Sequence, residues 1–336
     1  ADAQCTLRDL VSHRTGLSRH DMLWFGSPWS REEVIRKIGL VKLNRPFRSS
    51  FQYQNIAFAT AGYAVGTASK SSWEAFVQKR LLDPLGMTAT DLSIEAAQKS
   101  PDHATPHVKE EDGALKAVPW RGLENCAPAG AINSTARDLT RWVRFQLGDG
   151  TWEGKRLVSA AALEETKTPQ MVVRIEGSAK QTAVETETTQ RSYGMGWFIE
   201  DYRGQLLVSH GGNIDGFTTR IALLPRAKLG IVVLANLNGT LFNTAVSHGI
   251  TDLALGLPRK DWNGYYAGVM KRGEGAATAA RKEMEEKRHR DTKPSRDLSA
   301  YAGTYEEPAY GTATVTLEEG SLVLQWSRFR NRLEHW

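Results

Sequence analysis

Two short segments carry side chains of the types that do chemistry on bound molecules. Tyr53 and Asn55 lie two positions apart, directly before a stretch, 56–69, whose small residues predict a closely packed helix. In an extended approach to that helix, residues two apart project to the same side, so the phenol and the carboxamide would face one cleft. A structural alternative is a buried tyrosine followed by an asparagine that caps the helix.

The second segment is Ser209-His210-Gly211-Gly212-Asn213, which follows a strand-like run and precedes two more. Glycines beside a histidine weaken a sheet, and they commonly mark a place where another group approaches the backbone closely. A bound substrate is one candidate for that neighbour. The alternative is a glycine bulge next to a histidine whose hydrogen bonds are satisfied within the core.

The first third of the chain is predicted to be helical and well capped. A hydroxyl residue followed three positions later by a carboxylate is a capping box, which satisfies the free amides of a new helix. Such boxes begin at Thr6, Ser30 and Ser71, and a further helix start lies at Thr135. The third of these helices is expected to end before Pro84, because proline interrupts helices.

From residue 193 onward the pattern changes from helical to strand-like. Short runs of strand-forming residues, separated by turn residues, indicate an antiparallel sheet, and a helix at 243–255 could cover it. Helices, then adjacent strands, then a helix is an order typical of an α+β layered domain and not of alternating βαβ units. The predicted strands are 193–199, 205–209, 218–224 and 229–235.

The composition divides the chain into three parts. We expect a main domain at 1–257, followed at 258–295 by a helical linker rich in Lys, Arg, Glu and Ala. The last part, 296–336, has short strand signals interrupted by glycines and predicts the beginning of a small β domain. We expect that the final residues, 328–336, are too few to close that domain.

Composition also excludes several classes of function. The chain has 43 basic and 38 acidic residues and a net charge of +5, but the two signs interleave, whereas a nucleic-acid-binding face gathers basic residues. The longest clean apolar run, 231–235, is strand-sized and predicts no transmembrane helix. Cys5 and Cys126 fit no disulfide framework, so they form either one optional bridge or two buried thiols. His103 and His107 are interpreted as loop histidines, and no metal or cofactor is expected.

Six segments between residues 6 and 256 occur in an order that is more specific than any one of them. They resemble the corresponding segments of class C β-lactamase-like serine hydrolases and related penicillin-binding proteins. The resemblance implies a β-lactamase/transpeptidase-like fold, in which helices and a helical subdomain flank an antiparallel sheet. The tail from Asp297 resembles the small C-terminal domain appended to many such hydrolases. The segments are TLRDLVSHRTGL, FQYQNIAFATAGYAVG, PLGMTATDLS, APAGAINSTARDLTRW, YGMGWFI and SHGGNIDGFTTRIALLP followed by GIVVLAN.

The resemblance implies a three-part site, made of a Ser-x-x-Lys helix, a Tyr-x-Asn loop and a Lys/His-x-Gly strand. In that family the tyrosine, here Tyr53, helps to move the serine proton, and the asparagine, here Asn55, holds the substrate amide. The strand residues help to bind the substrate carboxylate, and here they are His210, Gly211 and Gly212.

The chemistry that the resemblance implies passes through an acyl-enzyme. The backbone N–H of Asn213 would supply half of an oxyanion hole for it. The substrate is a small molecule or peptide with a carboxylate, and β-lactams, D-aminoacyl peptides and esters all react in this way. The resemblance also implies export to the periplasm or the cell surface, and it leaves the oligomeric state open.

The first of the three parts is absent from residues 1–336, since no serine is followed three positions later by lysine. The nearest lookalike, Thr67-Ala68-Ser69-Lys70, follows the Tyr-x-Asn segment and is out of the family's order. The resemblance places the nucleophile before Ala1, so we expect this chain by itself to be nearly inert.

Without the family's lysine, His210 is the only cation that the sequence suggests near Tyr53. Tyrosine has an ordinary pKa of about 10 and histidine one of about 6.5, so a mostly neutral imidazole gives the phenolate little help at pH 7. The alternative from a different functional class is a non-catalytic module that binds cell-wall-type peptides.

Overall fold

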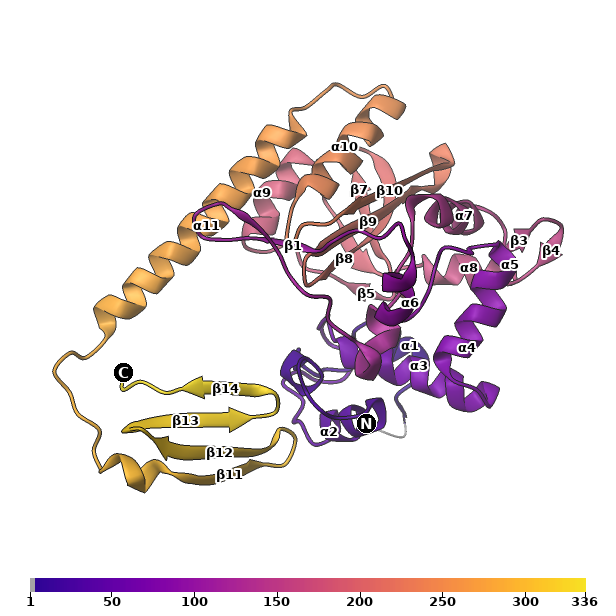
Figure 1. Cartoon of the computed structure of the whole chain (residues 1–336). Helices are drawn as coiled ribbons and strands as arrows, with labels where there is room; N and C mark the ends of the chain where they lie inside the picture. Colours follow the sequence, from indigo (N-terminus) through magenta and orange to yellow (C-terminus); the bar gives the residue numbers. More distant parts are fainter. Residues whose placement is uncertain (1–3) are drawn as a thin grey trace.

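The main domain is built around an antiparallel sheet with helices on both faces. A computed structural model describes residues 4–336 (Figure 1). The sheet has six strands in the order β10-β9-β8-β7-β6-β5, and each strand pairs antiparallel with its neighbours. The predicted α+β class is confirmed. The strands are β5 (Met171–Val172), β6 (Arg191–Tyr193), β7 (Phe198–Tyr202), β8 (Gln205–Ile214), β9 (Phe217–Leu224) and β10 (Leu229–Ala235).

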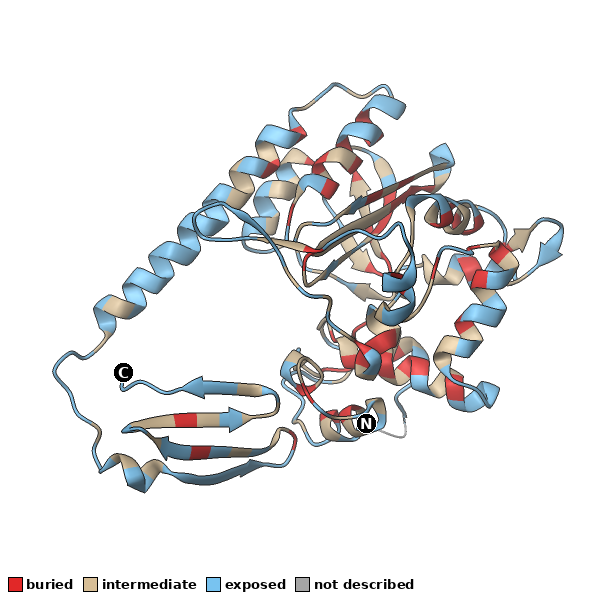
Figure 2. Cartoon of the chain, in the orientation of Figure 1, coloured by how far each residue is buried: buried red, intermediate tan, exposed pale blue. Residues whose placement is uncertain are grey.

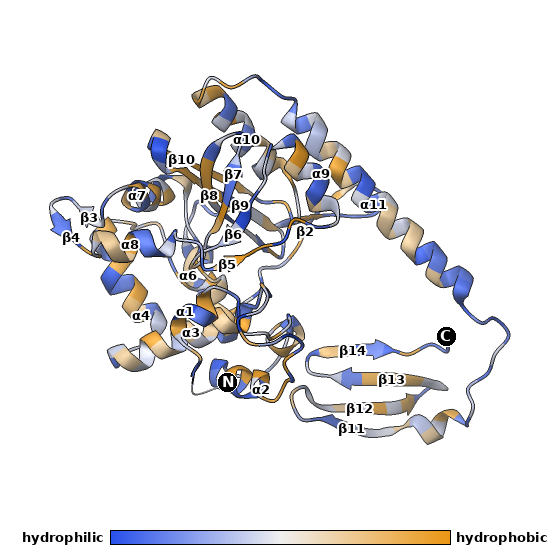
Figure 3. Ribbon diagram, turned by 180° about the vertical axis from the view of Figure 1, so that it is seen from behind, coloured by the Kyte–Doolittle hydropathy of each residue, from blue (hydrophilic) through white to orange (hydrophobic). Residues whose placement is uncertain are grey.

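The two faces of this sheet pack against different helices (Figure 1). Helix α7 (Ala136–Leu147) covers one face, where Val143 lies in a cluster with apolar residues of β7, β8 and β9. Helices α10 (Phe242–Ala254) and α11 (Trp262–Lys287) cover the other face. Figure 2 shows buried residues on the sheet, on the helices against it and in the helices beside it, and Figure 3 shows hydrophobic residues along β8 and β10.

Helix α11 is more than the solvated linker that the composition suggests. Trp262 and Tyr266 in its first two turns are buried in the core, while the residues from Lys271 to Arg281 are exposed. Asp252 fastens this end of the helix to the sheet. Its carboxylate accepts hydrogen bonds of 2.7 Å from both the Tyr202 hydroxyl and the Trp262 indole N–H.

The helical subdomain lies beside the sheet and contains α3 (Asn55–Ser69) at its centre. Capping boxes at Thr6 and Ser30 begin α1 (Leu7–Val11) and α2 (Arg31–Ile38), as predicted. The box predicted at Ser71 is wrong, because the Ser72 hydroxyl accepts from the Ala75 N–H and caps the helix one residue later.

The predicted helix end before Pro84 is also wrong. The helix continues from α4 (Trp73–Val77) through a π-helical turn, η3 (Gln78–Leu82), into α5 (Asp83–Leu85). Pro84 lies just after the π-helical turn, and the helix ends two residues later at Gly86, which has a positive φ of 67°.

Shorter elements complete the main domain. None of the helices within residues 4–336 has the length and apolar character needed to cross a membrane. The remaining helices are η2 (Asp21–Leu23), α6 (Ile94–Lys99), η4 (Glu124–Ala129), α8 (Ala160–Thr166), α9 (Ser178–Glu185) and η5 (Pro225–Ala227). The remaining strands form the hairpins β1 (His107–Lys109) with β2 (Leu115–Ala117) and β3 (Thr151–Trp152) with β4 (Lys155–Arg156).

The C-terminal residues form a separate four-stranded antiparallel sheet in the order β11-β12-β13-β14. It begins after a short helix, η6 (Leu298–Tyr301), and Figure 1 shows it beside α2, at a distance from the start of α11. Its strands are β11 (Gly303–Glu307), β12 (Gly311–Glu318), β13 (Ser321–Trp326) and β14 (Phe329–Arg332).

Two strand predictions need correction near the candidate site. The predicted strand 193–199 is two strands, because the chain turns at Gly194–Trp197, where the Gly194 N–H donates to the Trp197 carbonyl. The predicted strand 205–209 extends through the glycines to Ile214. Its register with β9 runs without interruption from Val208 to Ile214, so the glycine-bulge alternative is wrong.

Candidate active site

The candidate site begins at the end of β8 that carries the His-Gly-Gly segment. Strand β7 stops pairing with β8 at Ser209, so residues 210–214 pair with β9 alone and have an open edge on the other side. The backbone groups of such an edge are available to a bound molecule. Gly211 and Asn213 on this stretch are exposed.

Glycine at position 212 permits the close approach of β9. A Cβ atom added to Gly212 would lie 2.8 Å from the Thr219 Oγ1, and one added to Gly211 would lie 3.1 Å from the Thr219 carbonyl oxygen. The side chain of Asn213 is held by the turn that follows β10, since its Oδ1 accepts from the Gly239 N–H at 2.6 Å. These contacts with β9 and with the turn after β10 hold the backbone after His210 in place.

His210 is a neutral hydrogen-bonding group in this arrangement. Its Nδ1 lies 2.7 Å from the Gly211 carbonyl oxygen, which can only accept, so Nδ1 carries the proton. Its Nε2 then accepts from the Tyr193 hydroxyl at 3.1 Å. Burial lowers the pKa of His210, which the Gly211 carbonyl partly offsets and the charge of Arg220 reinforces.

Tyr53 lies against His210, with the two ring centroids 6.2 Å apart. Burial raises the pKa of the Tyr53 phenol, while the positive charge of Arg19 lowers it. The Arg19 guanidinium lies 5.3 Å from the centre of the Tyr53 ring. The expectation that His210 is the only cation near Tyr53 is therefore wrong. Arg19 is the charged group that favours the phenolate.

Beneath Tyr53 lies His13, which sequence reasoning did not single out. Its ring centroid is 4.2 Å from that of Tyr53, and it is fully buried with a positive φ of 56°. Its Nδ1 accepts from the Gln54 N–H at 3.1 Å. Burial lowers the pKa of His13 to about 3, with smaller contributions from His210 and Arg19, so the imidazole is neutral and supports the Tyr53 segment.

Asn55 begins α3, but it does not cap that helix. The Gln54 side chain is the cap and accepts from the Ile56 N–H at 3.0 Å, so the asparagine-cap alternative is wrong. The Asn55 Nδ2 donates to Asp21 Oδ1 at 3.0 Å. Asp21 also accepts from the Trp24 indole N–H at 2.9 Å. Asp21 is thus, with Arg19 and His13, a third residue near the site that the sequence did not reveal.

The two cysteines and the histidines at positions 103 and 107 take different places in the structure. The two cysteines are not joined to each other, so the predicted optional bridge is wrong, and the alternative of two buried thiols holds only for Cys126, because Cys5 is exposed. Burial raises the pKa of the Cys126 thiol to about 12. His103 lies in a loop, as predicted, and is hydrogen-bonded to the Ser100 carbonyl at 2.6 Å. The loop prediction for His107 is wrong, because His107 is the first residue of strand β1.

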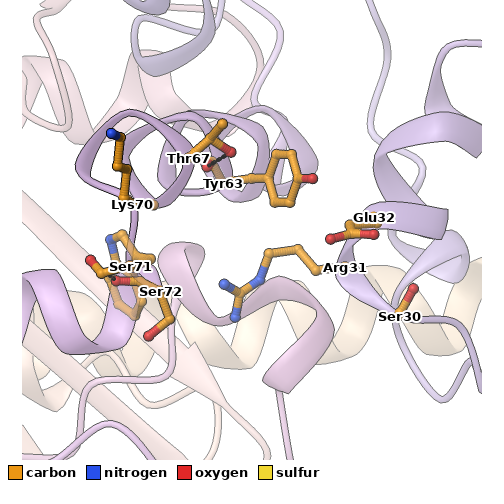
Figure 4. A pocket seen from close by; sticks show the side chains of 10 residues that line it. Ser30, Arg31, Glu32, Tyr63, Thr67, Lys70, Ser71 and Ser72 are labelled. Carbon is orange, nitrogen blue, oxygen red and sulfur yellow. Dashed lines mark hydrogen bonds between the residues drawn. The ribbon is translucent and has the colours of Figure 1, made fainter.

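A cavity lies at the opposite end of α3 from Tyr53. It has a volume of about 570 Å³ and contains Thr67 and Lys70, the out-of-order lookalike of the nucleophile segment. Figure 4 shows the Lys70 amine directed away from the Thr67 hydroxyl. That hydroxyl donates to the Tyr63 carbonyl at 3.0 Å, so this cavity has no activated nucleophile of the Ser-x-x-Lys kind.

Solved structures with similar folds come from several hydrolase-related proteins. An octameric penicillin-binding protein homologue from Pyrococcus abyssi has a TM-score of 0.63 and 20% identity, covering 97% of this chain and 68% of that chain. A D-amino acid amidase from Ochrobactrum anthropi SV3 has a TM-score of 0.59 and 19% identity, covering 75% of this chain and 72% of that chain. These likenesses confirm the predicted β-lactamase/transpeptidase-like fold.

Sequence relatives include named hydrolases. The unguisins hydrolase ungD of Aspergillus violaceofuscus is 27% identical over 97% of this chain, and this chain spans 61% of its length. Protein flp of Staphylococcus aureus is 27% identical over 64% of this chain, which corresponds to 39% of its own length.

Two family profiles divide the chain at α11. The profile of a domain of unknown function, DUF3471, matches residues 287–336 and therefore the C-terminal sheet. The profile described as Beta-lactamase matches residues 1–255. This second match covers most of the chain and confirms the resemblance drawn from the six segments. The chain is therefore a member of the β-lactamase family.

Proposed function

We propose that this chain supplies the substrate-binding and proton-transfer part of a serine hydrolase that works through an acyl-enzyme. The observation that supports the proposal is the contact between the rings of Tyr53 and His210 beside the open edge of β8. A phenol, an imidazole and an exposed strand edge together offer a proton carrier, a hydrogen-bonding group and backbone amides to one bound molecule.

Each residue has a stated role in this proposal. Tyr53 moves the proton of the attacking hydroxyl, and Asn55 holds the substrate amide. His210, Gly211 and Gly212 bind the carboxylate end of the substrate along β8. The Asn213 N–H contributes to the oxyanion hole, where removal of one donor in other hydrolases lowers the rate by about 10²–10³-fold.

The nucleophile is not among residues 1–336, because no Ser-x-x-Lys occurs in them. We propose that it belongs to residues of the complete protein outside this sequence, and that this chain alone does not turn substrate over. β-Lactams, D-aminoacyl peptides and esters share the acyl step, and we propose a carboxylated member of this group as the substrate.

A non-catalytic binding module is the second candidate. The lowered pKa of His210 supports it, because the imidazole is then a neutral hydrogen-bonding group. In this case the site recognises a cell-wall-type peptide without turnover.

Labelling of the complete protein separates the two functions. A fluorescent penicillin and an activated ester are incubated with it, and intact mass spectrometry detects the acyl adduct. The hydrolase proposal expects an adduct that Tyr53→Phe slows strongly. Tyr63→Phe is the matched control, because Tyr63 lies on α3, the helix that begins two residues after Tyr53, but lines the distant cavity. Reversible binding of a D-aminoacyl peptide by a folded protein that forms no adduct would instead establish the binding module.

A further inference from the structure

Residues 18–29 form a bridging segment between the candidate site and the C-terminal sheet. On the side of the site, this segment makes contacts with three consecutive residues. Its Ser18 carbonyl accepts from the Gln54 side-chain amide at 2.6 Å. Its Arg19 lies over the Tyr53 ring, and its Asp21 accepts from the Asn55 amide.

On its other side, the bridging segment holds the C-terminal sheet by polar contacts. His20 Nδ1 is hydrogen-bonded to the Tyr310 hydroxyl at 2.6 Å, and its Nε2 to the Ser18 hydroxyl at 2.9 Å. The Ser327 hydroxyl donates to the Gly26 carbonyl at 2.8 Å. Consecutive hydrogen-bonded residues thus connect Tyr310 with the segment that carries Tyr53 and Asn55.

Apolar packing supports the same contact. Ala309 of the C-terminal part is only 2% exposed and lies in a core cluster with Leu23, Val34, Ile38 and Ile56 of the main domain. The Phe329 ring stacks on Phe25 with centroids 6.5 Å apart. Ile56 directly follows Asn55, so this cluster reaches the first turn of the helix that presents the site.

The rest of the C-terminal sheet differs from this contact in its exposure. Every residue of β11 is exposed, and Figure 2 shows few buried positions elsewhere in the sheet. The sheet therefore has little core of its own, and its buried residues include one that belongs to the core of the main domain. It contacts the main domain at the bridging segment and at α2.

We propose that the C-terminal sheet helps to position the residues of the active site. Tyr310 of the C-terminal part and Asp21 of the bridging segment are the positioning residues. Tyr310 holds His20, which fixes the bridging segment. Asp21 and Arg19 on that segment then set the orientation of the Asn55 carboxamide and the environment of the Tyr53 phenol. The expected effect on catalysis rests on the proposed function. The expected effect of the C-terminal sheet on the order of residues 18–29 and 55–58 does not depend on that function.

The structural step is tested in this chain by hydrogen exchange. Tyr310→Phe removes the hydroxyl that binds His20, and we expect exchange of the amides in residues 18–29 and 55–58 to accelerate about tenfold, as loss of one hydrogen bond predicts. Tyr305→Phe is the matched control, because the Tyr305 hydroxyl bonds within the C-terminal part, to the Tyr301 carbonyl at 2.8 Å. Ala309→Glu places a charge in the apolar contact and should produce a larger acceleration. Unchanged exchange in both Tyr310→Phe and Ala309→Glu would overturn the proposal.

The catalytic step is tested in the complete protein. Tyr310→Phe and Asp21→Asn are expected to raise KM for the acylating ester and to lower kcat/KM about tenfold, while the unfolding midpoint of the main domain stays unchanged. Accelerated exchange together with unaltered KM and kcat in a protein that turns over would refute the positioning role. A wild-type protein without turnover would count against the proposed function, and the exchange result would then decide whether the sheet orders residues 18–29 and 55–58.

Discussion

The buried carboxylate of Asp9 binds the side chains of Arg14 and Arg48, which belong to two chain segments near the candidate site. It accepts from Arg14 Nε at 2.6 Å and from Arg48 Nε and Nη2, both at 2.8 Å. These guanidinium groups, Arg48 foremost, hold the pKa of Asp9 far below its usual range. Arg14 follows His13 directly, and the His13 carbonyl accepts from the Gln52 N–H at 2.8 Å, so the same contacts steady the approach to Tyr53.

Asp9→Asn removes the charge from this cluster and keeps its size. Breaking a fully buried ion pair typically costs 3–5 kcal/mol, and we expect about 3 kcal/mol here, because the half-exposed Arg48 side chain regains water. Urea unfolding at pH 7, followed by tryptophan fluorescence, measures this loss in the free energy of unfolding. Asp149→Asn is the control, since the exposed Asp149 pairs with an exposed Arg156 and should leave the midpoint nearly unchanged.

The difference in the free energy of unfolding between wild type and Asp9→Asn should decrease as the pH is lowered. Because the folded pKa of Asp9 lies below the unfolded value of about 3.9, its stabilising contribution is complete above that value and is lost as the pH falls toward the folded pKa. The difference between wild type and Asp9→Asn should therefore narrow below about pH 4. A loss smaller than about 1 kcal/mol at pH 7, or a difference that stays constant down to pH 3, would refute this reasoning.

Three further predictions concern the site and its surroundings. Because the pKa of His210 is lowered, the affinity for a carboxylated ligand, measured by calorimetry, should not change between pH 7 and pH 8. It should rise as the pH falls below the ordinary histidine value of about 6.5 and the imidazole gains a proton, and this rise should vanish in His210→Gln. Gly212→Ala should lower the free energy of unfolding by about 1–3 kcal/mol through its clash with the Thr219 hydroxyl, and Thr219→Ala should restore much of it in urea titrations. The buried Cys126 thiol should resist a disulfide reagent in the native state at pH 8 and react only on unfolding, whereas the exposed Cys5 should react at once; rapid native labelling of Cys126 would contradict its burial.

The sequence could predict the parts of the fold that depend on local pattern. The capping boxes at Thr6 and Ser30 and the strand 229–235 required only neighbouring residues, and the structure has them where the pattern indicates. The extent of β8 was missed, because glycines read locally as an interruption. Pairing with β9 carries the strand through them, and that pairing is a tertiary effect.

The candidate site shows the same limit more sharply. The types and positions of Tyr53, Asn55 and His210 drew attention to them, but their supporting residues did not. Asp21 and Asn55 are 34 positions apart, and nothing local marks their contact. The positive φ of His13 and its place under the Tyr53 ring likewise arise from packing that no periodicity encodes. Supporting contacts of this kind join distant segments and become visible only in three dimensions.

The length of α11 has a consequence for the contact at residues 18–29. A helix of 26 residues spans about 39 Å, and it leads the chain from the main sheet to the region where the C-terminal sheet returns to the bridging segment. The molecule therefore closes a loop, joined covalently at one end and by packing at the other. A released C-terminal sheet stays tethered at a high effective concentration, so rebinding is intramolecular and dilution of the protein does not open the contact.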